Sequence, residues 1–143
     1  MRDLGDDPRP VRGAVREIHA LDGAATLAYS PDLDGLADPG EIVWAWVPYD
    51  EDPSRGKDRP LLIVGRSGRR LLGMMLSSRG DGGPDWLRLG AWGRDERVSH
   101  VRLDRVFVLD EGDIRREGAV LDADRFARVA AQLMKTHGWS ASR

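Results

Sequence analysis

The sequence contains no cysteine among its 143 residues, which excludes a disulfide framework, a thiolate zinc site and a cysteine nucleophile. Lysine is also scarce, because 20 of the 22 basic residues are arginine. No apolar run approaches the roughly 20 residues that span a bilayer, and the first ten residues lack the pattern of a secretory signal. We therefore expect a cytoplasmic protein with no membrane segment and one main domain.

Histidine is rare too, because the chain has only His19, His100 and His137. Most catalytic arrangements that use histidine as acid or base therefore lack the residues they need. His100 lies in a basic part of the chain and is the one histidine for which we consider a role as general base. The acidic stretches "DEDP" and "DGGPD" have the composition of surface turns rather than of carboxylate cages. We therefore expect no metal site and no cofactor.

Charge is distributed unevenly along the chain, although the formal net charge is only -2. Residues 1–40 hold eight acidic and four basic side chains, whereas residues 55–105 hold twelve basic and six acidic ones. Guanidinium groups bind phosphate oxygens in pairs, so an arginine-rich middle segment fits a phosphate-bearing partner. A GC-rich genome would give the same arginine bias, and composition leaves both explanations open.

The apolar pattern predicts a small β-barrel followed by one helix. Residues 1–38 are rich in Asp, Gly and Pro, and we expect a poorly ordered acidic extension, in which residues 24–30 could add an edge strand. The stretch "EIVWAWV" is apolar on both faces and predicts a central strand. Further strands are predicted at residues 59–65, 70–78, 86–92 and 98–109, which gives five to six short strands in total.

The last element is predicted to be a helix over residues 122–137, at the end of a domain that spans residues 39–138. Phe126, Val129 and Leu133 fall on one apolar stripe with Ala130 and Met134. Asp122 is suited to cap the first turn, and Gly138 is suited to end the helix.

Arg59 and Ser77 are predicted to meet at one end of the sheet. A polar loop, residues 49–58, precedes Arg59 at the start of the second strand, and Ser77 ends the third. In a hairpin that turns near residues 67–68, the start of the first arm lies beside the end of the second. A permanent positive charge and a hydroxyl at this place could bind a phosphodiester and stabilise charge that develops on it. A surface arginine beside a strand-end serine, with no shared role, is the simpler alternative.

The run "PGEIVWAWVPYDEDPSRGKDRPLLIV", followed by "GMMLSSR" and "VRLDRVFVLDEGDIRREGAVLD", resembles the MazF/PemK family of toxins from type II toxin–antitoxin systems. The similarity extends over about residues 39–135. Gly40, Glu41, Arg59 and Pro60 match the family's opening strand and its Arg-Pro step. The resemblance implies a mainly β fold with α, an SH3-like barrel with a C-terminal helix, and a homodimer.

The resemblance also implies a metal-independent, sequence-specific endoribonuclease that cleaves single-stranded mRNA by attack of a 2′-hydroxyl on the adjacent phosphate. Arg59 falls on the family's catalytic arginine, and Ser77 replaces its catalytic threonine, which keeps the hydroxyl but loses the methyl that restrains χ1. A cognate antitoxin is the implied protein partner. Loops 50–58 and 79–85 would flank the RNA groove, with RNA held by Arg55, Lys57, Arg69, Arg70, Ser78 and Arg79.

The tryptophans have two interpretations. Trp86 or Trp92 could stack on bases of single-stranded RNA, although core packing is the commoner role, and we assign Trp44 and Trp46 to the core. Two further hypotheses stay open. The chain could be a non-catalytic barrel module that binds nucleic acid or a protein, or its acidic residues 1–38 could fold over the basic groove as an inhibitor.

Overall fold

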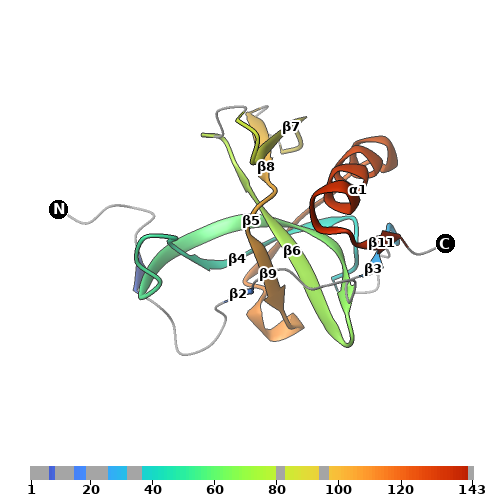
Figure 1. Cartoon of the computed structure of the whole chain (residues 1–143). Coiled ribbons are helices and arrows are strands. Elements are labelled where there is room, and N and C mark those ends of the chain that lie inside the picture. The colour runs from blue at the N-terminus through green and yellow to red at the C-terminus, as the bar shows by residue number, and fades with distance from the viewer. Residues whose placement is uncertain are drawn as a thin grey trace.

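A computed structural model describes residues 7–8, 15–18, 26–31, 37–79, 83–93 and 97–141 (Figure 1). These segments form a curled, mostly antiparallel sheet and one C-terminal helix, which confirms the predicted fold class. The elements in chain order are β1 (Asp7–Pro8), β2 (Arg16–Ile18), β3 (Thr26–Leu27), β4 (Glu41–Pro48), β5 (Arg55–Ser67), β6 (Arg70–Ser77), β7 (Trp86–Ala91), β8 (Val98–Arg102), β9 (Val106–Leu109), η1 (Glu111–Asp113), β10 (Arg116–Val120), α1 (Ala123–His137) and β11 (Ser140–Ala141).

The strands β4, β5 and β6 form the centre of the sheet, whose main order is β10-β4-β5-β6-β8-β7. Residues 71–73 of β6 pair with β9, whereas residues 76–77 at its end pair with β8. Because one strand changes neighbours along its length, the sheet curls into a half-open barrel. Figure 1 shows β7 and β8 projecting beyond the long curved arrows of β5 and β6.

The predicted hairpin between β5 and β6 is confirmed. Ser67 pairs with Arg70 across the turn, and Gly68 adopts a φ of +60°, in the left-handed region that favours glycine. Further along the hairpin Leu61 pairs with Met75, so the N-terminal half of β5 lies toward the C-terminal end of β6.

Strand β5 is longer than predicted. It begins at Arg55, so the expected loop over residues 49–58 ends earlier, and Lys57 pairs with Val47 of β4. Arg59 therefore lies inside a strand, opposite Ala45, and not at its start. Polar residues 55–58 carry no apolar alternation, and their strand conformation comes from pairing with β4 and β1.

Two other elements differ from the predictions. The predicted strand over residues 98–109 is divided into β8 and β9 by a bend at Leu103 and Asp104. Strand β10, which pairs with β4, was not predicted, because its side chains are mostly exposed and show no apolar periodicity. Gly118 lies at its bulge, where a Cβ atom would come within 2.7 Å of the carbonyl oxygen of Ile42.

Pro60 stands where β5 and β6 separate. The carbonyl of Trp44 accepts the N–H of Arg115, so the backbone polar groups of Trp44 face away from β5. Pro60 is the partner of Trp44, and in this kind of antiparallel pair its own nitrogen faces away from β4, toward β6. A proline has no N–H to donate, and the β5–β6 pairing stops at the preceding pair, Leu61 with Met75.

Two buried clusters fill the two faces of the sheet. One contains Phe126, Val129 and Leu133 of α1, packed against strands β5, β6 and β8, and the other lies around Phe107 and Ile63. The helix begins after the predicted cap Asp122, whose side chain accepts the N–H of Arg125, and ends at Gly138, as expected. No helix within the described ranges is long and apolar enough to cross a bilayer.

Short pieces of the N-terminal extension pair with the barrel. Strand β2 pairs with β9, and β3 pairs with both β5 and β11, which confirms the added edge strand expected within residues 24–30. A Cβ atom on Gly65 would lie 2.1 Å from the carbonyl oxygen of Thr26, so glycine allows β3 to approach β5 this closely. His19 lies outside the described residues.

Candidate functional site

A pocket of about 800 Å³ opens where β5 and β6 separate beyond Pro60. Its walls come from residues 57–60 and 76–79, with residues 117–119 of β10 and Trp92, Gly93, Arg97 and Ser99 around them. Arg59 and Ser77 both line this pocket, so the two residues expected to meet are brought together. Lys57, Ser78 and Arg79, predicted to hold RNA, line it as well.

Arg59 is partly buried in the pocket wall. Burial lowers the pKa of its guanidinium, and the positive charges of Arg105 and Arg79 act in the same direction, while Tyr49 and Glu51 oppose the shift. An arginine remains protonated at neutral pH under such conditions. Arg59 therefore presents a partly desolvated positive charge, which interacts with an anion more strongly than an exposed one does.

Ser77 ends β6 beside this charge. Its Oγ accepts the backbone N–H of Arg79 at 3.1 Å, which fixes the oxygen at the start of the following turn. The hydroxyl hydrogen remains available as a donor to an oxygen in the pocket. Ser78 and Arg79 follow it on the exposed turn.

Three residues predicted to hold RNA lie elsewhere. Arg69 and Arg70 are at the turn of the β5–β6 hairpin, and Arg70 is seven residues, or about 23 Å of strand, from Ser77 along β6. Arg70 lies 3.9 Å from the carboxylate of Asp110 instead. Arg55 is exposed at the first position of β5 and is not among the pocket residues.

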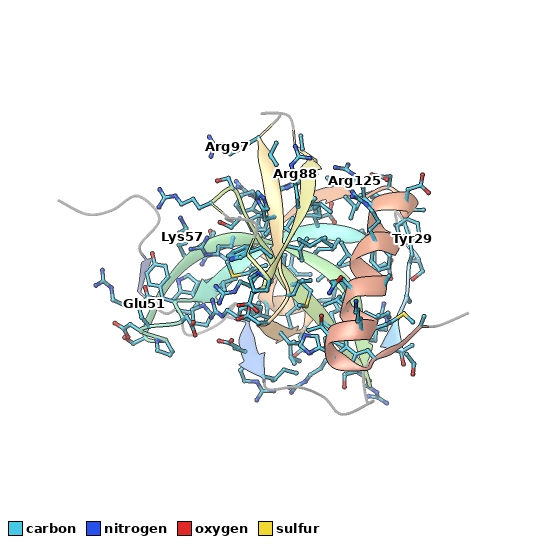
Figure 2. The ribbon with its side chains drawn as sticks, turned by 45° about the horizontal axis from the view of Figure 1, so that its top comes forward. Tyr29, Glu51, Lys57, Arg88, Arg97 and Arg125 are labelled. Carbon is cyan, nitrogen blue, oxygen red and sulfur yellow. The ribbon has the colours of Figure 1, made fainter. Side chains whose placement is uncertain are left out.

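The lining of the pocket is basic but mixed. Lys57 and Arg97, labelled in Figure 2, add two cations to Arg59 and Arg79. Two carboxylates that were not predicted, Asp58 and Glu117, lie in the same wall. Asp58 on β5 is 3.4 Å from the guanidinium of Arg115, which lies on the other side of β4. The sequence pattern places Asp58 in a loop, and Glu117 lies on β10, which that pattern does not predict.

Trp44 is not a core residue, contrary to the prediction, whereas Trp46 is fully buried. Trp44 is partly exposed and lines the pocket. Trp92 lines it too, whereas Trp86 lies outside and carries the guanidinium of Arg102 at 5.2 Å from its ring centroid.

His100 pairs with Ser77 across β8 and β6 but is absent from the pocket wall. Its Nδ1 atom is buried without a hydrogen bond in the described structure. The structure therefore gives no support to His100 as general base. The described side chains also contain no group of three or more His, Cys, Asp or Glu that could hold a metal ion.

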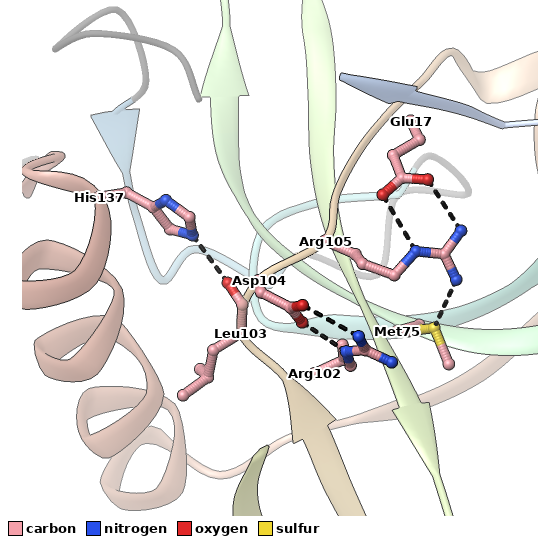
Figure 3. A network of polar contacts seen from close by, with 7 residues as sticks. All are labelled: Glu17, Met75, Arg102, Leu103, Asp104, Arg105 and His137. Atoms are coloured by element: carbon pink, nitrogen blue, oxygen red, sulfur yellow. Dashed lines mark hydrogen bonds and ion pairs between the residues drawn. The ribbon is translucent and has the colours of Figure 1, made fainter. Parts of the chain in front are cut away.

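An ion pair between a buried arginine and a partly exposed glutamate joins the extension to the barrel (Figure 3), and the sequence pattern does not predict it. Arg105, only 5% exposed, donates to both carboxylate oxygens of Glu17 at 3.0 and 2.8 Å. It also donates to the carbonyl of Pro48 at 3.0 Å and lies over the ring of Phe107. The two residues are 88 positions apart in the chain, so no local sequence pattern predicts the pair.

The fold and the pocket together define a small β-barrel with a basic site suited to a phosphodiester. The sequence pattern described as "PemK-like, MazF-like toxin of type II toxin-antitoxin system" matches residues 38–137, and the chain belongs to this family. The resemblance seen in the sequence is thereby confirmed.

Solved structures of the same fold include two crystal forms of MazE-MazF from Deinococcus radiodurans. Form II is 22% identical, with a TM-score of 0.56 over 72% of this chain and 96% of that chain. Form III is 21% identical, with a TM-score of 0.52 over 72% of this chain and 97% of that chain. Identities this low show the shared fold alone. No curated protein matches the chain.

Proposed function

We propose that this chain is a toxin that acts as a metal-independent, sequence-specific endoribonuclease on single-stranded mRNA. The observation that carries the proposal is that Arg59 and Ser77 line one pocket together with Lys57 and Arg79. This combination of a partly buried guanidinium, a hydroxyl and flanking cations suits a phosphodiester. Membership of the toxin family supports the same conclusion.

In the proposed reaction the 2′-oxygen of RNA attacks the adjacent phosphorus, and the bond from phosphorus to the 5′-oxygen breaks. The products are a 2′,3′-cyclic phosphate and a 5′-hydroxyl. Arg59 stabilises the charge on the pentacoordinate phosphorus and hydrogen-bonds the leaving 5′-oxygen, which takes a proton from water. Ser77 donates a hydrogen bond to a phosphate oxygen. The 2′-proton passes to a base, and the carboxylates of Asp58 and Glu117 line the pocket as acceptors.

The proposal includes a protein partner and a second subunit. A cytoplasmic toxin of this family requires an antitoxin, whose acidic or apolar segment would compete with RNA for the basic pocket. The similar Deinococcus structures are of MazE with MazF, which supports a partner of this kind. A homodimer is proposed on the family relationship alone.

The test is incubation of the purified protein with a long RNA in the presence of EDTA, followed by mapping of the 5′ ends. We expect discrete cuts with 5′-hydroxyl ends. Arg59→Ala should lower the cleavage rate by about 100-fold or more, the usual effect of removing one donor that stabilises transition-state charge. Arg128→Ala, an exposed arginine on α1, is the matched control and should cut at the wild-type rate.

Cleavage by Arg59→Ala at the wild-type rate would refute the assignment of Arg59. If the folded wild-type protein binds RNA saturably but never cuts it, the chain is instead a non-catalytic binding module. The replacement of the family threonine by Ser77 is the feature that favours this second function, because the hydroxyl is less restrained.

A further inference from the structure

Two tryptophans form an aromatic corner in the pocket that the proposed reaction does not use. The ring centroids of Trp44 and Trp92 lie 6.3 Å apart, with an angle of 50° between the ring planes. Both rings line the same pocket as Arg59 and Ser77. The corner thus combines apolar ring surface with a site for phosphate.

Each ring is held in place by a contact of its own. The Nε1–H of Trp92 donates to Oγ of Ser99 at 2.9 Å, and Ser99 is only 7% exposed. The guanidinium of Arg116 lies over the ring of Trp44, 4.3 Å from its centroid. Aromatic rings fixed in this way lose little conformational entropy when a ligand binds.

Both tryptophans are partly exposed. Trp44 is the one partly exposed residue of β4, whose other seven residues are buried. Trp92 is partly buried and packs against the core cluster around Leu76 and Val101. Core packing therefore does not account for the whole surface of either ring, and the remaining part borders a pocket within the roughly 300–1,000 Å³ range of ligand sites.

We propose that Trp92, together with Trp44, stacks on a nucleobase of the RNA whose phosphate lies at Arg59. This inference rests on the proposed function and adds to it a subsite for the base. Unpaired bases stack readily on aromatic side chains, and a duplex keeps its bases inside. The corner therefore selects single-stranded RNA and fixes the position of one nucleotide relative to the scissile phosphate.

The test compares two oligomers by fluorescence anisotropy, so that base stacking is separated from phosphate binding. One is a 2′-O-methyl RNA dodecamer of random sequence, which has bases but no 2′-hydroxyl to attack. The other is an abasic phosphodiester dodecamer with the same number of phosphates. We expect Trp92→Leu to weaken binding of the first by about 5- to 150-fold, the usual range for one stacked base, and to leave the second unchanged.

Two further variants serve as controls. Trp86→Leu removes a tryptophan that lies outside the pocket and should bind both oligomers as the wild type does. Trp92→Phe keeps an aromatic ring but loses the hydrogen bond to Ser99, and should retain most of the affinity. If Trp92→Phe keeps its affinity for the RNA analogue and Trp92→Leu loses it, the side chain acts by stacking on a base and not merely by filling space.

The outcomes distinguish the subsite from the enzyme. If Trp92→Leu binds the RNA analogue as tightly as the wild type, the subsite is refuted, while the cleavage assay still decides on the ribonuclease. Equal weakening toward both oligomers also refutes it, because the tryptophan would then support the pocket and not the base. If the wild-type protein binds neither oligomer and cuts no RNA, both the subsite and the proposed function fail.

Discussion

Glu17→Gln should destabilise the protein substantially, because it removes the counterion of a buried cation. The side chain of Arg105 is 6% exposed and that of Glu17 is 35% exposed. Removal of one partner from a buried pair costs roughly 3–5 kcal/mol. Since Glu17 is partly solvated, we expect about 3 kcal/mol, at the lower end of that range.

The assay is thermal unfolding by circular dichroism, together with urea unfolding, since urea does not screen charge. In a chain of this size, 3 kcal/mol corresponds to a fall in Tm of roughly 6–12 °C. Arg70→Gln is the control, because its pair with Asp110 is long, at 3.9 Å, and exposed, and such pairs contribute about 0–1 kcal/mol.

A double variant examines the reason for the effect. In Glu17→Gln/Arg105→Met the buried charge is gone, and an apolar side chain of similar length takes its place. We expect the double variant to be more stable than Glu17→Gln alone. A Glu17→Gln protein that melts within about 1 °C of the wild type would refute the reasoning, since it would show that the pair carries little of the stability.

Two further predictions concern other contacts. Gly65→Ala should lower the free energy of unfolding in urea by about 1–3 kcal/mol, because the added Cβ would lie 2.1 Å from the carbonyl oxygen of Thr26 and push β3 away. Gly112→Ala is the control and should change the stability little, because the space around Gly112 is open. The hydrogen bond from Arg102 lowers the pKa of Asp104 in the folded protein. The ionised Asp104 carboxylate therefore stabilises the fold fully above the unfolded-state pKa of about 3.9, and this stabilisation is lost as the pH falls through the folded-state pKa. Asp104→Asn should therefore flatten the stability profile below about pH 4, as measured by Tm; an unchanged profile would contradict this.

The sequence predicts well those features that depend on local order along the chain. The turn at Gly68 follows from a glycine between polar residues, and the register of that hairpin brings Arg59 to the same pocket as Ser77. The helix from Ala123 to His137 follows from its apolar stripe and from the cap at Asp122. The same hairpin register places Arg69 at the far end of the hairpin from Ser77, whereas grouping the basic residues by composition alone does not separate them.

The sequence predicts poorly where a partner strand, and not the residue itself, decides the conformation. Polar residues 55–58 have the composition of a loop but pair with β4, and β10 is exposed but completes the sheet edge. Trp44 alternates like a core residue, and its exposure to the pocket depends on how distant segments are arranged around it. Glu17 and Arg105 meet across 88 positions, and only the folded chain shows the pair.

Pro60 explains why the chemical group and the space for its ligand occur at the same place. A strand that continued to pair with β6 beyond Leu61 would place β6 directly beside Arg59 and leave no gap between the two strands there. Because Pro60 cannot donate a hydrogen bond on the β6 side, β6 turns to β8, and the gap that it leaves becomes the pocket. In the Arg-Pro step, Arg59 thus supplies the positive charge of the pocket, and Pro60 accounts for the opening beside it. Trp44 borders the same opening, so the proposed base subsite and the proposed phosphate site lie at one gap in the sheet.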